Sequence, residues 1–229
     1  MNRLAIFDFD GVIADSEIIA LAELQACLAE YGLHLSIEAL MDRFLGASLA
    51  SITAALAAHT GAPVPAGFRE AWYDRLFARY ARELQPVPGI LALFDRLEAA
   101  GVDTCIASGS SHRRLGFALH CLGLSDRFAG RAFSAEDVAE GKPAPDLMLF
   151  AAAQRGIAPE RCLVIEDATS GVTAAQRAGM RAIGFVGGRH LLPCAPRQAD
   201  RLRSAGTFAI AQTHQETGDL LLGPQGFGA

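Results

Sequence analysis

The chain has 229 residues, 51% of them hydrophobic and 20% charged, which excludes a disordered chain and predicts one large domain or two small ones. Its net charge of −5, without a lysine- or arginine-rich block, argues against nucleic acid or a membrane surface as partner. No apolar run reaches the ~18 residues of a membrane span, and the first ten positions already hold acidic residues, unlike a signal peptide. Five cysteines without a C-x-x-C pair indicate free thiols, so we expect a cytoplasmic protein.

The predicted elements fall into three blocks along the chain. A buried strand is predicted at residues 4–8, where an apolar run ends in a carboxylate. From Ser16 to residue 85 apolar residues recur at helical spacing, which predicts an all-helical insert. Beyond it, strand and helix signals alternate: strands at 102–107, 162–166, 181–186 and 207–211, and helices near 89–100, 111–122, 145–155 and 170–178. The residues after His214 are rich in glycine and turn formers, and we expect them to fray.

Apolar strands separated by helices of about 10–15 residues indicate a parallel sheet with helices on both faces. The fold class is therefore α/β, with an all-helical segment inserted after the first strand. We place the boundaries so that residues 1–15 and 86–229 form the sheet-containing core and residues 16–85 the insert, called the helical insert below.

Polar and charged side chains gather at the predicted strand ends, where open parallel sheets bind their ligands. They are Asp8 and Asp10 after the first strand, Ser108, Gly109 and Ser110 after the second, Glu166 and Asp167 at the third, and Lys142 in the loop before it. Four clustered carboxylates repel one another unless a cation lies among them, and Mg²⁺ is the natural candidate for oxygen ligands. The Ser-Gly turn at a helix start offers a hydroxyl and backbone N–H groups to an anion. Together these features predict phosphoryl transfer.

Lys142 is the only lysine in the chain, and its ammonium suits a phosphate group. Asp8 and Asp10 are two residues apart, so on an extended backbone their carboxylates point the same way. One can attack phosphorus while the other handles the proton of the leaving oxygen. Gly11 allows a sharp turn and a close approach of its backbone to the substrate.

These motifs resemble the four motifs of the haloacid dehalogenase superfamily of phosphohydrolases, through Asp8-Phe9-Asp10-Gly11, Ser108, Lys142-Pro143, and Glu166-Asp167 with Gly171. The resemblance implies a Rossmann-like parallel-sheet core with an all-helical cap domain, here the helical insert. It implies that Asp8 is the nucleophile that forms an aspartyl-phosphate, and that Asp10 protonates the leaving group and then activates water. Ser108 and Lys142 would hold the phosphoryl group. Mg²⁺ would be bound by the Asp8 carboxylate, the Asp10 carbonyl and Asp167, with Glu166 supporting them.

Within this family the sequence resembles the β-phosphoglucomutase-like subfamily, with which it shares residues 141–146. The presence of Asp10 argues against dehalogenation, and the absence of lysine from the helical insert argues against phosphonatase chemistry. Ala20 and Leu49 stand where the mutases carry a histidine and an arginine, which favours hydrolysis over mutase activity. The segment from Arg43 to Gly46 is similar to that of bacterial phosphatases that act on small sugar phosphates.

We therefore expect a Mg²⁺-dependent phosphatase that hydrolyses a small phosphomonoester, a sugar phosphate such as 6-phosphogluconate, and that is a monomer. Candidate substrate-binding residues are Gly11, Gly109, Ser110, Arg43, Ser48 and Glu17. Trp72 and Tyr73 are expected in the core of the insert. Two alternatives stay open: a β-phosphoglucomutase-like phosphotransferase, and a catalytically idle regulatory protein on the same fold.

Overall fold

The computed structural model describes residues 3–44 and 49–227, which form a six-stranded parallel sheet in the order β3-β2-β1-β4-β5-β6. The strands are β1 (Arg3–Phe7), β2 (Val102–Ser108), β3 (Ala132–Ser134), β4 (Cys162–Glu166), β5 (Arg181–Phe185) and β6 (Ala209–Ala211). The chain builds outward from β1 on one side and then returns to β4 on the other. The carboxyl ends of β1 and β4 therefore flank the point where the strand order reverses, at which folds of this type bind ligands.

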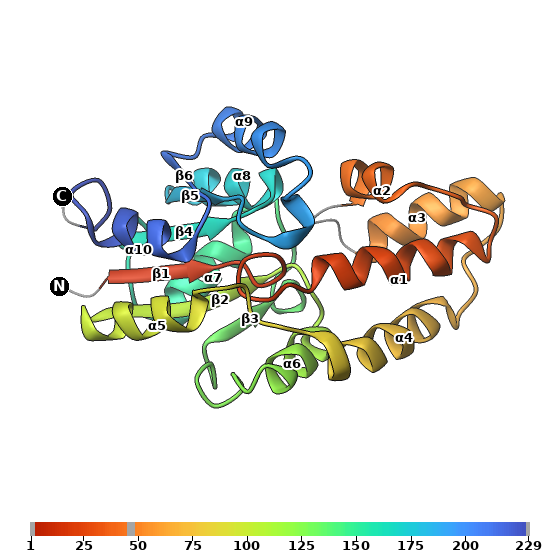
Figure 1. Cartoon of the computed structure of the whole chain (residues 1–229), viewed down its shortest axis with the longest axis horizontal. Helices are drawn as coiled ribbons and strands as arrows, with labels where there is room; N and C mark the ends of the chain where they lie inside the picture. Colours follow the sequence, from red (N-terminus) through yellow and green to blue (C-terminus); the bar gives the residue numbers. More distant parts are fainter. Residues whose placement is uncertain (1–2, 45–48, 228–229) are drawn as a thin grey trace.

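Helices cover both faces of the sheet, and the alternation of side chains along β1 fixes which residues face which layer (Figure 1). Ala5 and Phe7 pack in one hydrophobic cluster with α5 (Ile90–Ala99), α6 (His112–Cys121) and α10 (His214–Leu222). Leu4 and Ile6 pack in the other cluster. That cluster contains α7 (Asp146–Gln154), α8 (Thr169–Arg177) and α9 (Ala195–Ala205). Short 3₁₀ turns lie at η1 (Ala135–Asp137), η2 (Pro159–Arg161) and η3 (Arg189–Leu191). The α/β fold class is confirmed.

The helical insert lies beyond the carboxyl end of β1, and Figure 1 shows that strand pointing towards it. Its helices are α1 (Glu17–Ala29), α2 (Ile37–Phe44), α3 (Leu49–Thr60) and α4 (Phe68–Glu83). Residues of these helices and of one sheet face belong to a single hydrophobic cluster, to which the turn after Asp8 contributes Phe9, Val12 and Ile13. The insert is thus packed directly over the sheet edge that carries the predicted motifs.

The two chain crossings between core and insert are held together by backbone contacts. Asp15 N donates to Gln85 O at 3.0 Å, and Val87 N donates to Ile13 O at 2.8 Å. Ala14 forms an isolated antiparallel bridge with Pro86. We propose that the domain boundaries lie at this pair of crossings, as the division at residues 15/16 and 85/86 predicts.

The structure differs from the sequence-based expectation at three places. The strand β3 has only three residues and was not expected, since so short an apolar run gives no periodic signal. No helix was expected at Ala195–Ala205. The expectation that the chain frays after His214 is wrong, because α10 begins there. Thr213 caps α10 by accepting from Glu216 N, and the His214 ring stacks on Phe185 with centroids 4.3 Å apart.

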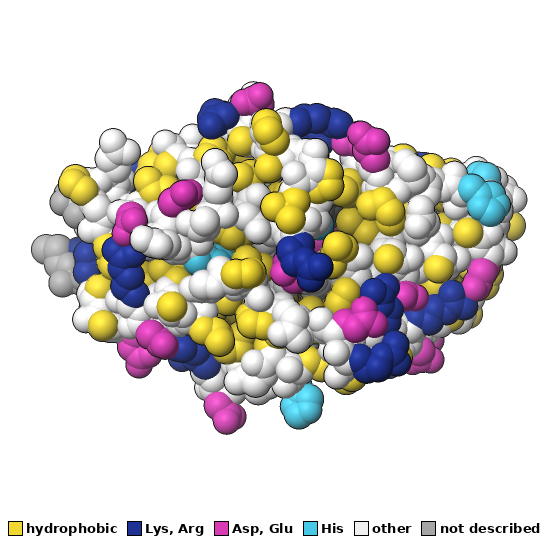
Figure 2. Space-filling view, in the orientation of Figure 1, with side chains coloured by type: hydrophobic (Ala, Val, Ile, Leu, Met, Phe, Trp, Pro, Cys, Tyr) yellow, Lys and Arg dark blue, Asp and Glu magenta, His cyan; other side chains and the backbone are white. Residues whose placement is uncertain are grey.

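Acidic and basic side chains are interspersed on the face shown in Figure 2, without a continuous basic stripe. Among the described residues, no helix combines the length and the apolar character needed to cross a membrane.

Candidate active site

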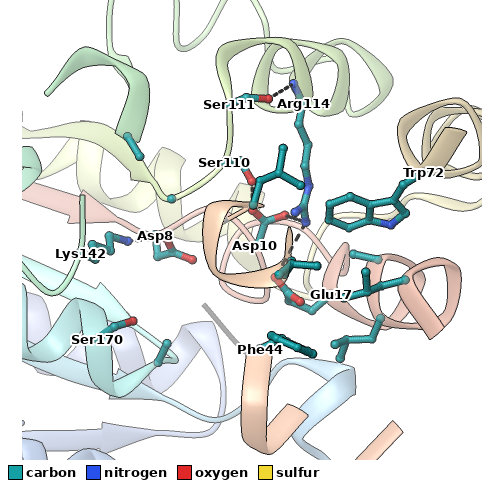
Figure 3. A pocket seen from close by; sticks show the side chains of 18 of the residues that line it. Asp8, Asp10, Glu17, Phe44, Trp72, Ser110, Ser111, Arg114, Lys142 and Ser170 are labelled. Carbon is teal, nitrogen blue, oxygen red and sulfur yellow. Dashed lines mark hydrogen bonds and ion pairs between the residues drawn. The ribbon is translucent and has the colours of Figure 1, made fainter. Parts of the chain in front are cut away.

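A cavity of about 260 Å³ lies between the carboxyl edge of the sheet and the helical insert. Its lining from the core, called the core wall below, includes Asp8, Asp10, Gly109, Ser110, Ser111, Arg114, Lys142, Glu166, Asp167 and Ser170. Its lining from the insert, called the insert wall, consists of Glu17, Ala20, Leu21, Leu24, Phe44, Leu49, Ile52, Arg69, Trp72 and Tyr73. Figure 3 shows Lys142 and Asp8 on one side of this space, and Trp72 and Phe44 on the other.

Lys142 lies between two buried carboxylates of the core wall. Its Nζ is 2.6 Å from Asp8 Oδ1 and 2.5 Å from Glu166 Oε1. Burial raises the pKa of Asp8 to about 7, although the ammonium of Lys142 opposes that rise. Burial also raises the pKa of Glu166, again against the effect of Lys142. For Lys142, burial favours the neutral amine, but Asp8 and Glu166 outweigh it and raise its pKa. The lysine is therefore held as a cation at the centre of the core wall.

Asp167 completes a group of three carboxylates with Asp8 and Glu166, whose oxygens lie within 4.8 Å of one another. If all three are ionised, the one ammonium of Lys142 leaves two negative charges unbalanced. Burial raises the pKa of Asp167 well above its usual range, with Asp8 adding to that rise. Its Oδ2 is buried and has no hydrogen-bond partner among the described residues. A buried carboxylate oxygen without a hydrogen-bond partner, in a group of three crowded carboxylates, fits a hard divalent cation, whose charge would let all three ionise.

Asp10 is held by three donors. Its Oδ1 accepts from the Ser16 hydroxyl at 2.5 Å and from Arg114 Nη2 at 2.8 Å, and its Oδ2 accepts from the Ser110 hydroxyl at 2.7 Å. These three contacts fix the orientation of the carboxylate at the cavity. A serine hydroxyl can accept as well as donate, so Ser16 and Ser110 can remain partners when Asp10 carries the proton.

Two glycines lack the side chains that would otherwise fill the space occupied by the carboxylates of Asp167 and Glu166. Gly11 has a φ of +82°, and a Cβ there would lie 2.1 Å from Asp167 Oδ2. A Cβ on Gly171 would lie 1.7 Å from Glu166 Oε1. Both positions therefore exclude any side chain as long as the acidic group keeps its place. Gly11 itself is absent from the cavity lining, so its contact is with Asp167.

The predicted anion cradle lies where β2 meets α6. Ser111 is the N-cap of α6, and its side chain accepts from Arg114 N at 3.3 Å. Gly109 and Ser110 line the cavity as expected. Ser108 is fully buried at the end of β2, where its hydroxyl accepts from Ser110 N at 3.0 Å, and it is absent from the lining. Its predicted role in holding the phosphoryl group stays a prediction.

The insert residues that were predicted to bind substrate differ in their placement. Glu17 lines the cavity, and burial raises its pKa to about 7. Arg43 is exposed, is absent from the lining, and lies with its guanidinium over the Phe44 ring. Ser48 lies outside the described residues. Trp72 and Tyr73 are buried in the insert, as expected, and they also line the cavity.

The sequence analysis missed two residues of the core wall and its surroundings. Arg114 lies on the first turn of α6 with its side chain 12% exposed; its Nη2 also lies 3.8 Å from Glu17, and its Nε donates to the Tyr80 hydroxyl. His190 follows β5, and its Nε2 lies 3.1 Å from Asp167 Oδ2, though neither atom makes a hydrogen bond within the described residues. Strand position could have indicated His190, because β5 ends at the same sheet edge as β1 and β4.

Comparison with known proteins now decides the family. The family model of haloacid dehalogenase-like hydrolases matches residues 3–179, which span β1, the helical insert, α8 and all the motifs described above. The chain belongs to this family.

A curated relative of this haloacid dehalogenase-like hydrolase is the 6-phosphogluconate phosphatase of Escherichia coli (strain K12). The two are 28% identical over 196 residues, which cover 84% of this chain and 87% of the relative. A haloacid dehalogenase-like protein of unknown function from Agrobacterium tumefaciens str. C58 has a crystal structure that is similar, with a TM-score of 0.80, 35% identity, and coverage of 96% of this chain and 98% of that chain.

A HAD family hydrolase from Deinococcus radiodurans R1, solved with bound phosphate and sodium, is similar with a TM-score of 0.74. It is 33% identical, over 96% of this chain and 95% of that chain. The family and its phosphatase members make this haloacid dehalogenase-like hydrolase a phosphoric monoester hydrolase.

Proposed function

We propose that this chain is a Mg²⁺-dependent phosphatase that hydrolyses a small sugar phosphate through an aspartyl-phosphate on Asp8. The observation that carries the proposal is the buried group of Asp8, Glu166 and Asp167 around Lys142, with an unpaired oxygen on Asp167. The Deinococcus relative binds phosphate and sodium, and the Escherichia coli relative is a phosphatase of a phosphorylated sugar acid, which supports this class of substrate.

Asp8, Asp167 and the backbone carbonyl of Asp10 would hold the metal ion, and Glu166 would support them through Lys142. When bound, Mg²⁺ would supply positive charge that neutralises the carboxylates and the phosphoryl oxygens. Lys142 adds an ammonium at the same place, and the cradle at Gly109 and Ser110 adds backbone donors.

In the first step, a carboxylate oxygen of Asp8 attacks phosphorus, and the bond between phosphorus and the substrate's ester oxygen breaks. Asp10 gives its proton to that oxygen, so the alcohol leaves neutral. In the second step, water attacks the phosphorus of the aspartyl-phosphate and gives a proton to Asp10, which returns Asp8 to a carboxylate and releases phosphate. Ser16, Ser110 and Arg114 hold Asp10 where both transfers begin and end. The helical insert would close the site against bulk water.

The test is phosphate release from a panel of sugar, polyol and nucleotide monophosphates, measured with Mg²⁺ and with EDTA. We expect Mg²⁺-dependent release from sugar or polyol phosphates. Release that is unchanged by EDTA would contradict the metal requirement, and no release from any monophosphate would contradict the function. Transfer of phosphate to a second sugar position, seen by product analysis, would favour the phosphotransferase alternative.

A further inference from the structure

Each cation that lines the cavity among the described residues already lies beside a carboxylate. The described lining holds six carboxyl residues but only three cations, Arg69, Arg114 and Lys142. Lys142 lies against Asp8 and Glu166, and Arg114 lies 2.8 Å from Asp10. Arg69 is more than half exposed, with Nε 3.2 Å from Glu70. Once the phosphoryl group of a substrate occupies the core wall, Arg69, exposed and already beside Glu70, is the one cation of the described lining that a second anion could meet.

The insert wall, which would face the leaving group, is largely apolar. Leu21, Leu24, Phe44, Ile52 and Trp72 are each less than 7% exposed, and all line the cavity. Placing a carboxylate or a second phosphate against such a surface costs its hydration without an ion pair in return. The wall suits the C–H groups of a carbon skeleton.

One polar group of the insert wall is placed to bind an uncharged oxygen. Glu17 lines the cavity with its Oε1 3.8 Å from Arg114 Nη2, and Figure 3 shows it beside Arg114 and Asp10. Its carboxyl can bond a hydroxyl but repels an anion.

We propose that the substrate's leaving group is electrically neutral and hydroxylated, of the sugar or sugar-alcohol class, and that the insert wall selects against a second anionic group. This inference rests on the proposed phosphatase function and narrows it. The apolar face of this leaving group packs on the insert wall, and one of its hydroxyls bonds Glu17. A phosphorylated sugar acid is then a poorer substrate than the matching phosphorylated sugar alcohol.

A matched pair of substrates isolates the charge. Sorbitol 6-phosphate and 6-phosphogluconate share one six-carbon chain and differ only in a hydroxymethyl or a carboxylate group at C1. We expect kcat/KM to be at least tenfold higher for sorbitol 6-phosphate, with Mg²⁺ saturating. Equal or higher kcat/KM for 6-phosphogluconate overturns the inference but leaves the phosphatase function intact. Failure to release phosphate from any monophosphate overturns the proposed function itself, and the inference with it.

A pair of variants tests whether the insert wall causes the selection. Leu49 lines the cavity at the start of α3 and is half-buried, so a longer side chain can reach solvent. In Leu49→Arg the ratio of the two kcat/KM values should fall at least fivefold, whereas in Leu49→Gln, of similar length but neutral, it should stay as in the wild type. An equal change of the ratio in both variants contradicts a charge-based selection.

Discussion

The two walls of the cavity are built on opposite physical principles. The core wall holds the three buried carboxylates of Asp8, Glu166 and Asp167, and Lys142 binds the first two of them. The insert wall is a hydrophobic surface in which Glu17 and Arg69 are the charged side chains of the described lining. The core wall can thus neutralise and transfer a phosphoryl group, whereas the insert wall can only select the leaving group that is bonded to the phosphoryl group. Substitutions should separate these two tasks.

Removing the nucleophile should have the largest effect and should affect only the chemistry. We expect Asp8→Asn to lower kcat by at least about 10³-fold, because an amide cannot attack phosphorus. The thermal unfolding transition should persist, since the amide relieves crowding of negative charge. Phosphate release and circular dichroism measure the two effects, with Asp126→Asn as an exposed control. Mass spectrometry excludes deamidation back to aspartate, and near-normal turnover in a verified variant would contradict the mechanism.

The second-largest effect is expected from Gly171→Ala, which disturbs the core wall without replacing a charged residue. In Gly171→Ala the new Cβ must displace Glu166, which in turn frees Lys142 from one of its two partners. We expect kcat/KM to fall by about 10²-fold and the free energy of unfolding to fall by about 1–3 kcal/mol. Gly116→Ala is the matched control, because Gly116 lies in α6 with open space around it. Full activity in Gly171→Ala would show that the Glu166 position is unimportant.

Acid should weaken the core through His214, which anchors the turn after Asp10 by its contact with the Val12 carbonyl at 2.8 Å. Burial lowers the pKa of His214 to about 4, against the opposing hydrogen bond to Val12. Below about pH 6.5 the His214 imidazole is therefore protonated in the unfolded chain, whereas in the folded chain it is protonated only below about pH 4. The contribution of neutral, buried His214 to the free energy of unfolding is complete above pH 6.5. It is lost as the pH falls, and the loss is about 2 kcal/mol at pH 5.

Urea unfolding at pH 7 and pH 5 measures this loss. In His214→Gln the fall in the free energy of unfolding between the two pH values should be smaller than in the wild type by about 2 kcal/mol. The exposed His120→Gln should behave as the wild type. Equal pH dependence in His214→Gln and the wild type would contradict the buried neutral state of His214.

The smallest effect concerns metal affinity. His190 is buried with its Nε2 3.1 Å from Asp167, and Gly11 and Gly188 close around it. Loss of such a group that orients a ligand typically weakens metal binding about tenfold or more. We expect calorimetric titration to show about tenfold weaker Mg²⁺ binding by His190→Gln. Since the readout is binding alone, an unchanged Kd would refute the orienting role whatever the activity.

The sequence predicts more of the residues of the core wall than of the insert wall, for a physical reason. Asp8, Asp10, Glu166 and Asp167 lie at or just after the ends of buried strands, and strand ends in a parallel sheet meet at one edge. Arg114 and His190 were not predicted from the sequence, because their side chains reach the site from a helix turn and from the loop after β5. The insert wall depends on how four helices pack, so helical spacing could not show that Trp72 and Leu21 line a cavity or that Arg43 does not.

The central claim is that the core wall carries the phosphoryl group on Asp8, and single-turnover labelling tests it most directly. An excess of enzyme is mixed with Mg²⁺ and a ³²P-labelled monophosphate that the enzyme hydrolyses. The reaction is quenched in acid before the single turnover is complete, and the protein is digested for peptide analysis. We predict label on the peptide that contains Asp8, appearing and decaying at the rate of phosphate release, and no label in Asp8→Asn. Full turnover without label on Asp8 at any time would contradict the account.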